Sequence, residues 1–153
     1  MRRVFRLVRP DYAPGLDGLG ARRDGGRWNS AGRAAVYCAS SVSLAAMEVF
    51  VHLPPSMRTP DKLPKLMLVM LDIPDGLPGI AVDMADVPAP QGIHDYRAIG
   101  DRWLAAGHAV WMDVPSLVIP YERNLVLNPN HPNMGSVVVS AVVPFVYDQR
   151  MGH

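Results

Sequence analysis

Short apolar segments, separated by stretches rich in glycine and proline, make up most of this chain. These segments have the length and composition of β-strands, and strands are predicted at 4–8, 34–39, 65–73, 109–114, 117–119 and 137–146. The run of leucine, methionine and valine within 65–73 indicates a strand that is buried in its sheet. Pro144 favours an edge position or a bulge for the last strand, because proline cannot donate a ladder hydrogen bond.

A helix is predicted directly after the second strand. Ser40 or Ser41 can cap its N-terminus, and it ends near Leu53, where two prolines follow. Glu48 is the only charged residue in the apolar stretch SVSLAAMEVFVHL. Because this helix is apolar nearly all round, we expect it to be buried together with Glu48.

The remaining segments complete an α+β pattern. A second helix is predicted over 94–106 and ends at Gly107. The range 10–32 is predicted to be a loop rich in glycine and arginine, and 128–135 a further loop; the turn-rich range 74–92 has no predicted order. Short strands with few helices predict a single α+β domain over residues 1–153, built on a small mixed sheet.

Composition excludes several classes of protein. The chain has 153 residues, of which 49% are apolar, enough for one core. The net charge of +1 predicts no nucleic-acid surface. We find neither a stretch long enough to span a membrane nor a signal peptide. The single cysteine, Cys38, allows no internal disulfide and fits a reducing cytoplasm. The histidines lack the spacing of metal ligands, so no metal site is predicted.

Three residues in the first third of the chain are candidates for chemistry. Arg27 lies in the glycine loop GGRWN, where Trp28 should anchor the loop to the core, and its planar guanidinium is well shaped for phosphate. Tyr37 lies on a predicted strand, and its alternative is a ring packed in the core. For Glu48 the alternative to a catalytic role is a structural ion pair with a buried arginine.

Two polar residues in the second half are further candidates. Ser116 follows Pro115, but no GxSxG motif surrounds it, so we do not expect a hydrolase nucleophile. For Ser116 we expect a hydrogen bond to a ligand. The alternative is a turn serine bonded to local backbone, and Asn124 has the same alternative.

Taken together, the motifs resemble those of one known family. The segments that carry the resemblance are FRLVRP, GGRWNSAGRAAVYCASSVSLAAMEVFVHL, GDRWLAAGHAVWMDVPSLVIPYERNLVLNPNHP and PFVYDQRM. In this order, over nearly the whole chain, they resemble the RES-domain family, the toxins of Xre–RES toxin–antitoxin pairs. The arginine, glutamate and serine that give the family its name look like Arg27, Glu48 and Ser116. Tyr37 resembles its strand tyrosine and Arg6 its first-strand arginine.

The resemblance implies a fold similar to that of ADP-ribosyltransferases and an activity on NAD⁺. Such an enzyme cleaves the nicotinamide–ribose bond, with phosphate or water as acceptor. Two alternatives remain open: an ADP-ribosyltransferase that modifies a specific protein, and a non-catalytic subunit of an Xre complex. The implied partner is an Xre-family antitoxin in the cytoplasm, and a homodimer within the toxin–antitoxin complex is an assembly that the relationship allows.

The resemblance also assigns roles to the candidate residues. Glu48 would stabilise the charge that develops on the ribose, as a carboxylate does in glycoside hydrolysis. Arg27 would hold the pyrophosphate or an incoming phosphate, Tyr37 would lie near the nicotinamide ribose, and Ser116 would orient the ligand. Arg6 and Asn124 would complete the NAD⁺ site. No cofactor is expected beyond NAD⁺ as the substrate.

Overall fold

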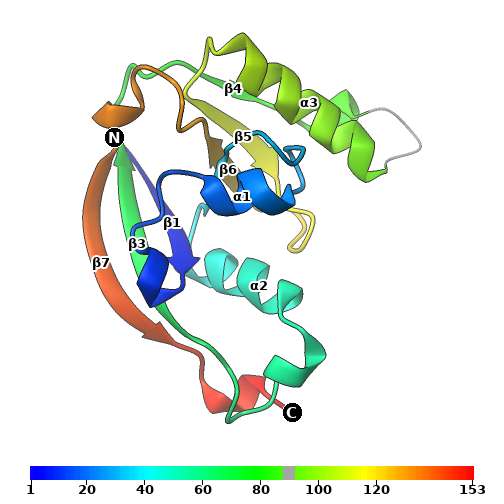
Figure 1. Ribbon diagram of the computed structural model, residues 1–153, viewed down its shortest axis with the longest axis vertical. Coiled ribbons are helices and arrows are strands. Elements are labelled where there is room, and N and C mark those ends of the chain that lie inside the picture. The colour runs from blue at the N-terminus through cyan, green and yellow to red at the C-terminus, as the bar shows by residue number, and fades with distance from the viewer. Residues whose placement is uncertain (88–91) are drawn as a thin grey trace.

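A seven-stranded mixed sheet forms the centre of the computed structural model, which describes residues 1–87 and 92–153 (Figure 1). The strands lie in the order β4-β5-β6-β2-β1-β3-β7, and all neighbours are antiparallel except β4 and β5. Their bounds are Arg2–Val8 for β1, Val36–Ala39 for β2, Lys65–Ile73 for β3, Gly79–Ala81 for β4, Trp111–Pro115 for β5, Arg123–Leu127 for β6 and Val138–Val146 for β7.

Three α-helices accompany the sheet within the described residues. They are α1 at Leu19–Asp24, α2 at Val42–His52 and α3 at Ile93–Ala106. Short 3-10 helices lie at Pro10–Tyr12, Pro55–Met57, Met84–Asp86, Met134–Ser136 and Gln149–Met151. None of the helices in this part of the chain is both long and apolar enough to cross a bilayer. The structure is therefore a single α+β domain, as the sequence predicts.

Helices α2 and α3 cover different halves of the same face of the sheet. Residues alternate between the two faces along a strand, and on β2 Tyr37 and Ala39 share one face. Tyr37 packs with the cluster beneath α3, which contains Trp103, whereas Ala39 packs with the cluster beneath α2, which contains Leu44. Both helices therefore lie above this face.

The apolar patterns predict most of these elements correctly. The expected strands at 4–8, 34–39, 65–73, 109–114 and 137–146 correspond to β1, β2, β3, β5 and β7, and the two expected helices correspond to α2 and α3. Ser41 is the cap of α2, since its side chain accepts a hydrogen bond from the Leu44 N–H. β7 pairs only with β3 and so forms an edge of the sheet, as Pro144 predicts.

Two predictions about elements are wrong, and two strands were not predicted. The predicted loop at 10–32 contains α1 and the first 3-10 helix. The segment 117–119 is not a strand, because its backbone turns around the Ser116 hydroxyl, which accepts hydrogen bonds from two of its N–H groups. β6 follows this turn and was not predicted, nor was the short β4.

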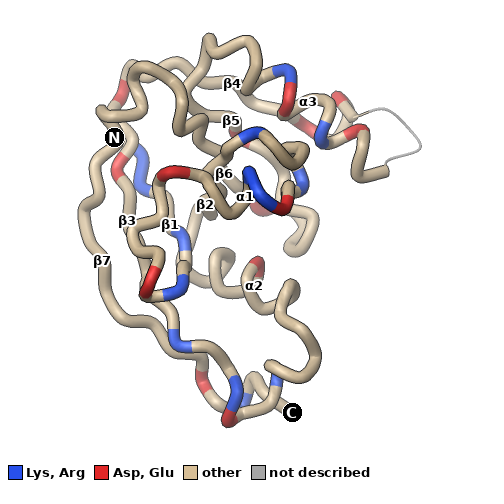
Figure 2. The backbone as a smooth tube through the Cα atoms, in the orientation of Figure 1, with Lys and Arg blue, Asp and Glu red and all other residues tan. Residues whose placement is uncertain are grey.

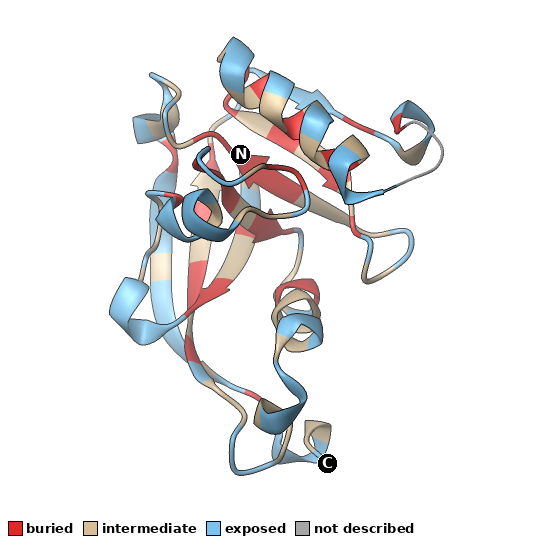
Figure 3. Cartoon of the chain, turned by 45° about the vertical axis from the view of Figure 1, so that its right-hand side comes forward, coloured by how far each residue is buried: buried red, intermediate tan, exposed pale blue. Residues whose placement is uncertain are grey.

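The predicted burial of α2 on all sides is also wrong. Only Leu44 and Ala45 of this helix are buried, and Val51 is 45% exposed. Buried residues concentrate in the centre of the sheet and on the inner side of α3 (Figure 3). One side of α2 instead borders an open cleft, so the apolar sequence of this helix does not mean that it is buried on all sides.

Candidate active site

A cleft of about 1510 Å³ lies between α2, the 9–27 segment and the connection from β5 to β6. Five of the predicted site residues line it: Arg6, Arg27, Tyr37, Glu48 and Asn124. They come from β1, the glycine loop, β2, α2 and β6. The fold therefore gathers residues that are spread over most of the sequence, and a cleft of this size exceeds what a small metabolite fills.

Glu48 is the only acidic residue of α2, and the red on the tube of this helix in Figure 2 marks an acidic residue. Its Oε1 accepts a hydrogen bond of 2.8 Å from Ser116 Oγ and one of 2.6 Å from Asn124 Nδ2. Within the described residues, no arginine pairs with Glu48 and no donor reaches its Oε2. The alternative of a structural ion pair is therefore wrong, and one carboxylate oxygen is fixed while the other is available to a ligand.

Ser116 is buried behind Glu48 and does not line the cleft. While its hydroxyl donates to Glu48, it accepts hydrogen bonds from Val118 N–H at 3.2 Å and Ile119 N–H at 3.0 Å. The hydroxyl proton and both lone pairs are thus used. Ser116 is both the expected turn serine and a donor that orients the carboxylate.

Arg27 lies at the corner of a tight turn. Gly26 N–H donates to the Asn29 carbonyl at 2.9 Å, which closes the turn around Arg27 and Trp28. Trp28 is 3% exposed and anchors the turn in the core, as predicted. The Arg27 side chain is exposed, its Cζ lies 5.4 Å from the centre of the Tyr96 ring, and no carboxylate within the described residues pairs with it. It is thus a cation at the cleft wall that can pair with an anionic ligand.

Tyr37 lies beneath this turn. Its hydroxyl donates to Asn29 Oδ1 at 2.6 Å and accepts from Trp28 N–H at 3.0 Å. Burial raises the pKa of Tyr37 well above its ordinary value, so the hydroxyl remains protonated at neutral pH. The expected contact of Tyr37 with the nicotinamide ribose stays a prediction, and its hydroxyl is already engaged with the protein.

Two buried polar atoms in the cleft residues have no hydrogen-bond partner within the described residues. They are Nε of Arg6 and Oδ1 of Asn124. Arg6 is otherwise held by a hydrogen bond of 3.0 Å from Nη1 to the Tyr37 carbonyl. Buried polar atoms without partners are rare, so the cleft favours a ligand that supplies both acceptors and donors.

Helix α3 anchors the glycine loop from the other side, which the sequence did not reveal. Arg97 Nε donates to the Gly26 carbonyl at 2.9 Å, and Asp101 accepts from Ser30 N–H at 2.9 Å and from Ser30 Oγ at 2.6 Å. A Cβ at Gly100 would lie 1.6 Å from the Trp28 carbonyl oxygen. The loop and α3 are therefore in direct backbone contact, which requires a glycine at position 100. This glycine within a predicted helix is the one sequence feature that could have indicated the contact.

Asn29 is a second residue that the sequence analysis missed. It is fully buried, and its Nδ2 donates to the carbonyls of Ala21 and Arg33 at 2.9 Å each. Asn29 thus ties the turn to α1 and to the approach of β2. Its partners all lie within eight residues in the sequence, but no motif there indicates that the loop folds back around Asn29.

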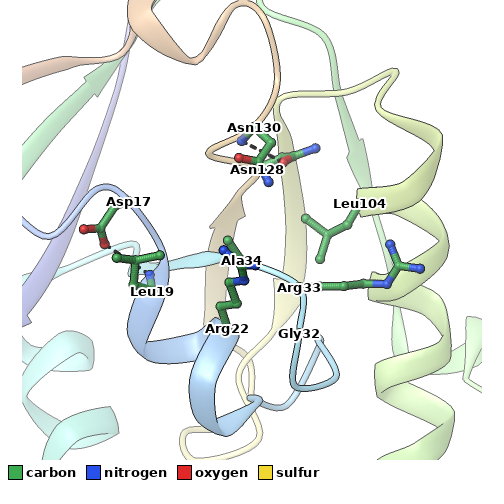
Figure 4. A pocket seen from close by; sticks show the side chains of 9 residues that line it. All are labelled: Asp17, Leu19, Arg22, Gly32, Arg33, Ala34, Leu104, Asn128 and Asn130. Atoms are coloured by element: carbon green, nitrogen blue, oxygen red, sulfur yellow. Dashed lines mark hydrogen bonds between the residues drawn. The ribbon is translucent and has the colours of Figure 1, made fainter.

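A smaller pocket of about 290 Å³ lies between α1, α3 and the segment after β6 (Figure 4). Arg22, Arg33 and Asn128 are among its lining residues, and none of the predicted site residues is. Figure 4 shows Arg33 directed toward α3, where its Nε lies 3.9 Å from Asp101 Oδ1. No group of three or more histidine, cysteine, aspartate or glutamate side chains in the described ranges is arranged to hold a metal ion. The chemistry of the predicted residues thus belongs to the large cleft.

Comparison with known proteins adds a family to this geometry. A model described as the RES domain matches residues 3–148. The "Toxin Res" of Photorhabdus laumondii is 38% identical over 131 residues, covering 82% of this chain and 81% of the relative. The "Prs ADP-ribosylating toxin" of a Sphingobium species is 35% identical over 156 aligned residues, covering 97% and 94%. The M. tuberculosis MbcT–MbcA toxin–antitoxin complex contains a chain of similar fold, with a TM-score of 0.70 at 19% identity, covering 94% of this chain and 84% of that chain.

Proposed function

Because the chain belongs to the RES-domain family, we propose that it is a toxin that consumes NAD⁺ by cleaving the bond between nicotinamide and ribose, with phosphate or water as acceptor. The names of its relatives support a toxin. The observation that carries the proposal is the state of Glu48, whose Oε1 is fixed by two donors while Oε2 receives none from the described residues.

Cleavage of an N-glycosidic bond builds positive charge on the ribose. We place Oε2 of Glu48 against a ribose hydroxyl, so that the hydrogen bond between them strengthens as this charge develops. Ser116 and Asn124 hold the other oxygen from two different segments, so the carboxylate needs little rearrangement during the reaction. Preorganised groups of this kind supply a large share of the rate enhancement in many enzymes.

The phosphate groups of NAD⁺ need cations, and the arginines that line the cleft without a carboxylate partner in the described residues include Arg6 and Arg27. Arg27 presents an exposed guanidinium, and Arg6 leaves its buried Nε without an acceptor. We assign both to the pyrophosphate, or one of them to an incoming phosphate. The planar guanidinium can bind phosphate oxygens through two parallel hydrogen bonds.

A second candidate reaction is the transfer of ADP-ribose to a protein. The name of the Sphingobium relative, which matches nearly the whole chain, favours it. The same cleft would bind NAD⁺ and the same residues would weaken the glycosidic bond. Only the acceptor differs, and acceptor choice depends on what can enter the cleft.

We further propose that an antitoxin controls this activity in the cytoplasm. One structural neighbour is a chain of a toxin–antitoxin complex, which supports a protein partner of this kind. An Xre-type antitoxin and a homodimer within the complex stay predictions.

The test is the incubation of the purified protein with NAD⁺, with and without phosphate and with a cell lysate. Loss of NAD⁺ that requires phosphate identifies phosphorolysis, and loss in its absence identifies hydrolysis. A protein labelled from an NAD⁺ analogue identifies transfer. If no NAD⁺ is consumed under any of these conditions, the proposal is wrong and a non-catalytic subunit becomes the better description.

A further inference from the structure

We propose that the Tyr37 hydroxyl is a positioning group, which fixes the Gly26–Asn29 turn that carries Arg27 and does not itself contact the substrate. The inference rests on the proposed function for the role of Arg27 and gives Tyr37 a different role from the expected ribose contact. Tyr37 remains one of the residues that line the cleft. The hydroxyl acts on the ligand only through Arg27.

The hydrogen bonds of this hydroxyl leave little for a ligand. A tyrosine hydroxyl has one proton to donate, and Tyr37 donates it to Asn29 Oδ1 at 2.6 Å. It accepts the Trp28 N–H at 3.0 Å. A ligand that needs a donor at this point therefore finds none.

Gly26 covers the hydroxyl closely. A Cβ at Gly26 would lie 2.6 Å from the Tyr37 hydroxyl and 2.8 Å from Asn29 Oδ1. The backbone of the turn thus rests directly on this hydrogen-bonded pair, and the glycine is what permits the contact. Burial, which raises the pKa of Tyr37 above its ordinary value, keeps the hydroxyl a donor over the physiological pH range.

Asn29 extends the constraint into the rest of the fold. Its amide donates to Ala21 of α1 and to Arg33, each at 2.9 Å, and the residue is fully buried. The amide therefore cannot rotate without losing these bonds, and its Oδ1 gives the Tyr37 proton a fixed acceptor. A chain of hydrogen bonds that runs from Tyr37 through Asn29 to α1 therefore fixes the turn.

Arg27 needs this support more than Glu48 does. An exposed arginine has several rotatable bonds, so its reach into the cleft depends on the position of its backbone. Glu48 is held independently, by Ser116 and Asn124, which belong to other segments. Removal of the Tyr37 hydroxyl should therefore weaken binding of the phosphate-bearing part of the ligand and leave the step at the ribose largely intact.

A double-mutant cycle tests the inference. Wild type, Tyr37→Phe, Arg27→Ala and the double variant are titrated with ADP-ribose by calorimetry and assayed with NAD⁺. We expect Tyr37→Phe to weaken ADP-ribose binding by about tenfold, in the range of one lost hydrogen bond whose partners stay buried, and to raise KM more than it lowers kcat. In the Arg27→Ala background the same substitution should change affinity by less than about twofold, because coupled groups are not additive.

Tyr147→Phe is the matched control. It also removes one buried hydroxyl donor, which donates to the Ala46 carbonyl at 2.6 Å, but it lies far from the Arg27 turn in the sequence and makes no bond to it. It should lower the melting temperature by an amount similar to Tyr37→Phe and leave ADP-ribose affinity unchanged.

If Tyr37→Phe weakens ADP-ribose binding equally in the wild-type and Arg27→Ala backgrounds, the hydroxyl contacts the ligand itself. If Tyr37→Phe leaves the affinity of the wild-type background unchanged, Arg27 does not need the hydroxyl. Either result overturns the inference. Hydrogen exchange of the Trp28 amide, measured by NMR without ligand, tests the inference independently of the proposed function. If the wild-type protein neither consumes NAD⁺ nor binds ADP-ribose, the proposed function is wrong. Faster exchange of the Trp28 amide in Tyr37→Phe would still support the positioning role, and unchanged exchange would reject it.

Discussion

Ser116 and Glu48, which are 68 residues apart in the sequence, are joined by a hydrogen bond of 2.8 Å between Ser116 Oγ and Glu48 Oε1. The bond connects the turn after β5 to the middle of α2. Because Ser116 is buried and Glu48 lines the cleft, the serine acts from behind the carboxylate. Of Arg27, Glu48 and Ser116, the three residues that the family resemblance predicts together, only Ser116 does not line the cleft.

The first prediction concerns this bond. Ser116→Ala should lower kcat for NAD⁺ roughly tenfold and leave KM within about twofold, since a lost hydrogen bond to a charged group costs about 1.5–3 kcal/mol and Asn124 still holds the same oxygen. Steady-state kinetics with Ser43→Ala, an exposed serine of α2, as the control would check it. A raised KM with unchanged kcat would instead place Ser116 in contact with the ligand.

The second prediction concerns the carboxylate. Glu48→Gln keeps an oxygen that can accept from Ser116 and Asn124, but removes the charge. NAD⁺ turnover should fall roughly 10²–10³-fold, the scale of losing one preorganised electrostatic group, while the melting temperature changes little because no ion pair within the described residues is broken. Glu122→Gln, which changes the only other glutamate of the chain, is the control. Turnover close to that of wild type would remove Glu48 from the mechanism.

The third prediction concerns the contact between α3 and the glycine loop. Gly100→Ala would place a methyl group 1.6 Å from the Trp28 carbonyl oxygen, so the helix and loop must separate. We expect a loss of about 1–3 kcal/mol in the free energy of unfolding, as for overpacked cores, and a higher KM for NAD⁺. Gly20→Ala in α1, where a Cβ meets no atom within 4 Å, should be neutral or slightly stabilising. Equal denaturation midpoints for the two variants would show that the contact is not tight.

The sequence predicts those parts of the fold that have a local signal. Apolar runs mark β3 and β7, and a serine cap with two following prolines marks α2. β6 was missed because its first residues are polar and so give no apolar strand pattern. They are polar because they bind residues of other segments: Arg123 pairs with Asp83 and Asp113, and Asn124 binds Glu48. α1 was missed because a six-residue helix with a glycine and two arginines resembles a loop.

The same distinction applies to the site. The residue types and their motifs predicted Arg27, Tyr37 and Glu48, and the fold brings all three to one cleft. The supports of these residues were not predicted: Asp101 reaches Ser30 across 71 residues of sequence, and the bonds of Asn29, although local, depend on the path of the loop between α1 and β2. Burial of α2 was predicted wrongly for a related reason: an apolar helix face that borders a cleft has the same sequence pattern as one in the core.

The fourth prediction concerns Cys38, which is 4% exposed on β2. Burial raises the pKa of its thiol to about 11 from an ordinary value of 9.0. In the unfolded chain the thiol ionises first, so the stability that the buried neutral thiol contributes is complete below about pH 9 and is lost as the pH rises toward 11. Chemical denaturation from pH 7 to 10.5 should show a steeper decline for wild type than for Cys38→Ala. Parallel curves would indicate that the thiol ionises equally in both states.

The last prediction distinguishes a phosphate grip from a simple positive charge at Arg27. A guanidinium can bind two phosphate oxygens through parallel hydrogen bonds, whereas the ammonium of lysine offers a point charge on a flexible stem. The Arg27 side chain is exposed and pairs with no carboxylate in the described part of the chain, so its replacement breaks no internal ion pair.

Arg27→Lys should therefore raise KM for NAD⁺ and weaken ADP-ribose binding by roughly tenfold, the value of one charge-assisted hydrogen bond, with an unchanged melting temperature. Calorimetric titration of ADP-ribose, and separately of inorganic phosphate, measures this. Arg22→Lys is the control, because Arg22 is also an exposed arginine but lines the smaller pocket instead of the cleft.

Weaker phosphate binding together with unchanged ADP-ribose binding would move Arg27 from the pyrophosphate to the acceptor. Equal affinities of Arg27→Lys and wild type for both ligands would show that any positive charge suffices at this position, and the bidentate grip would be wrong.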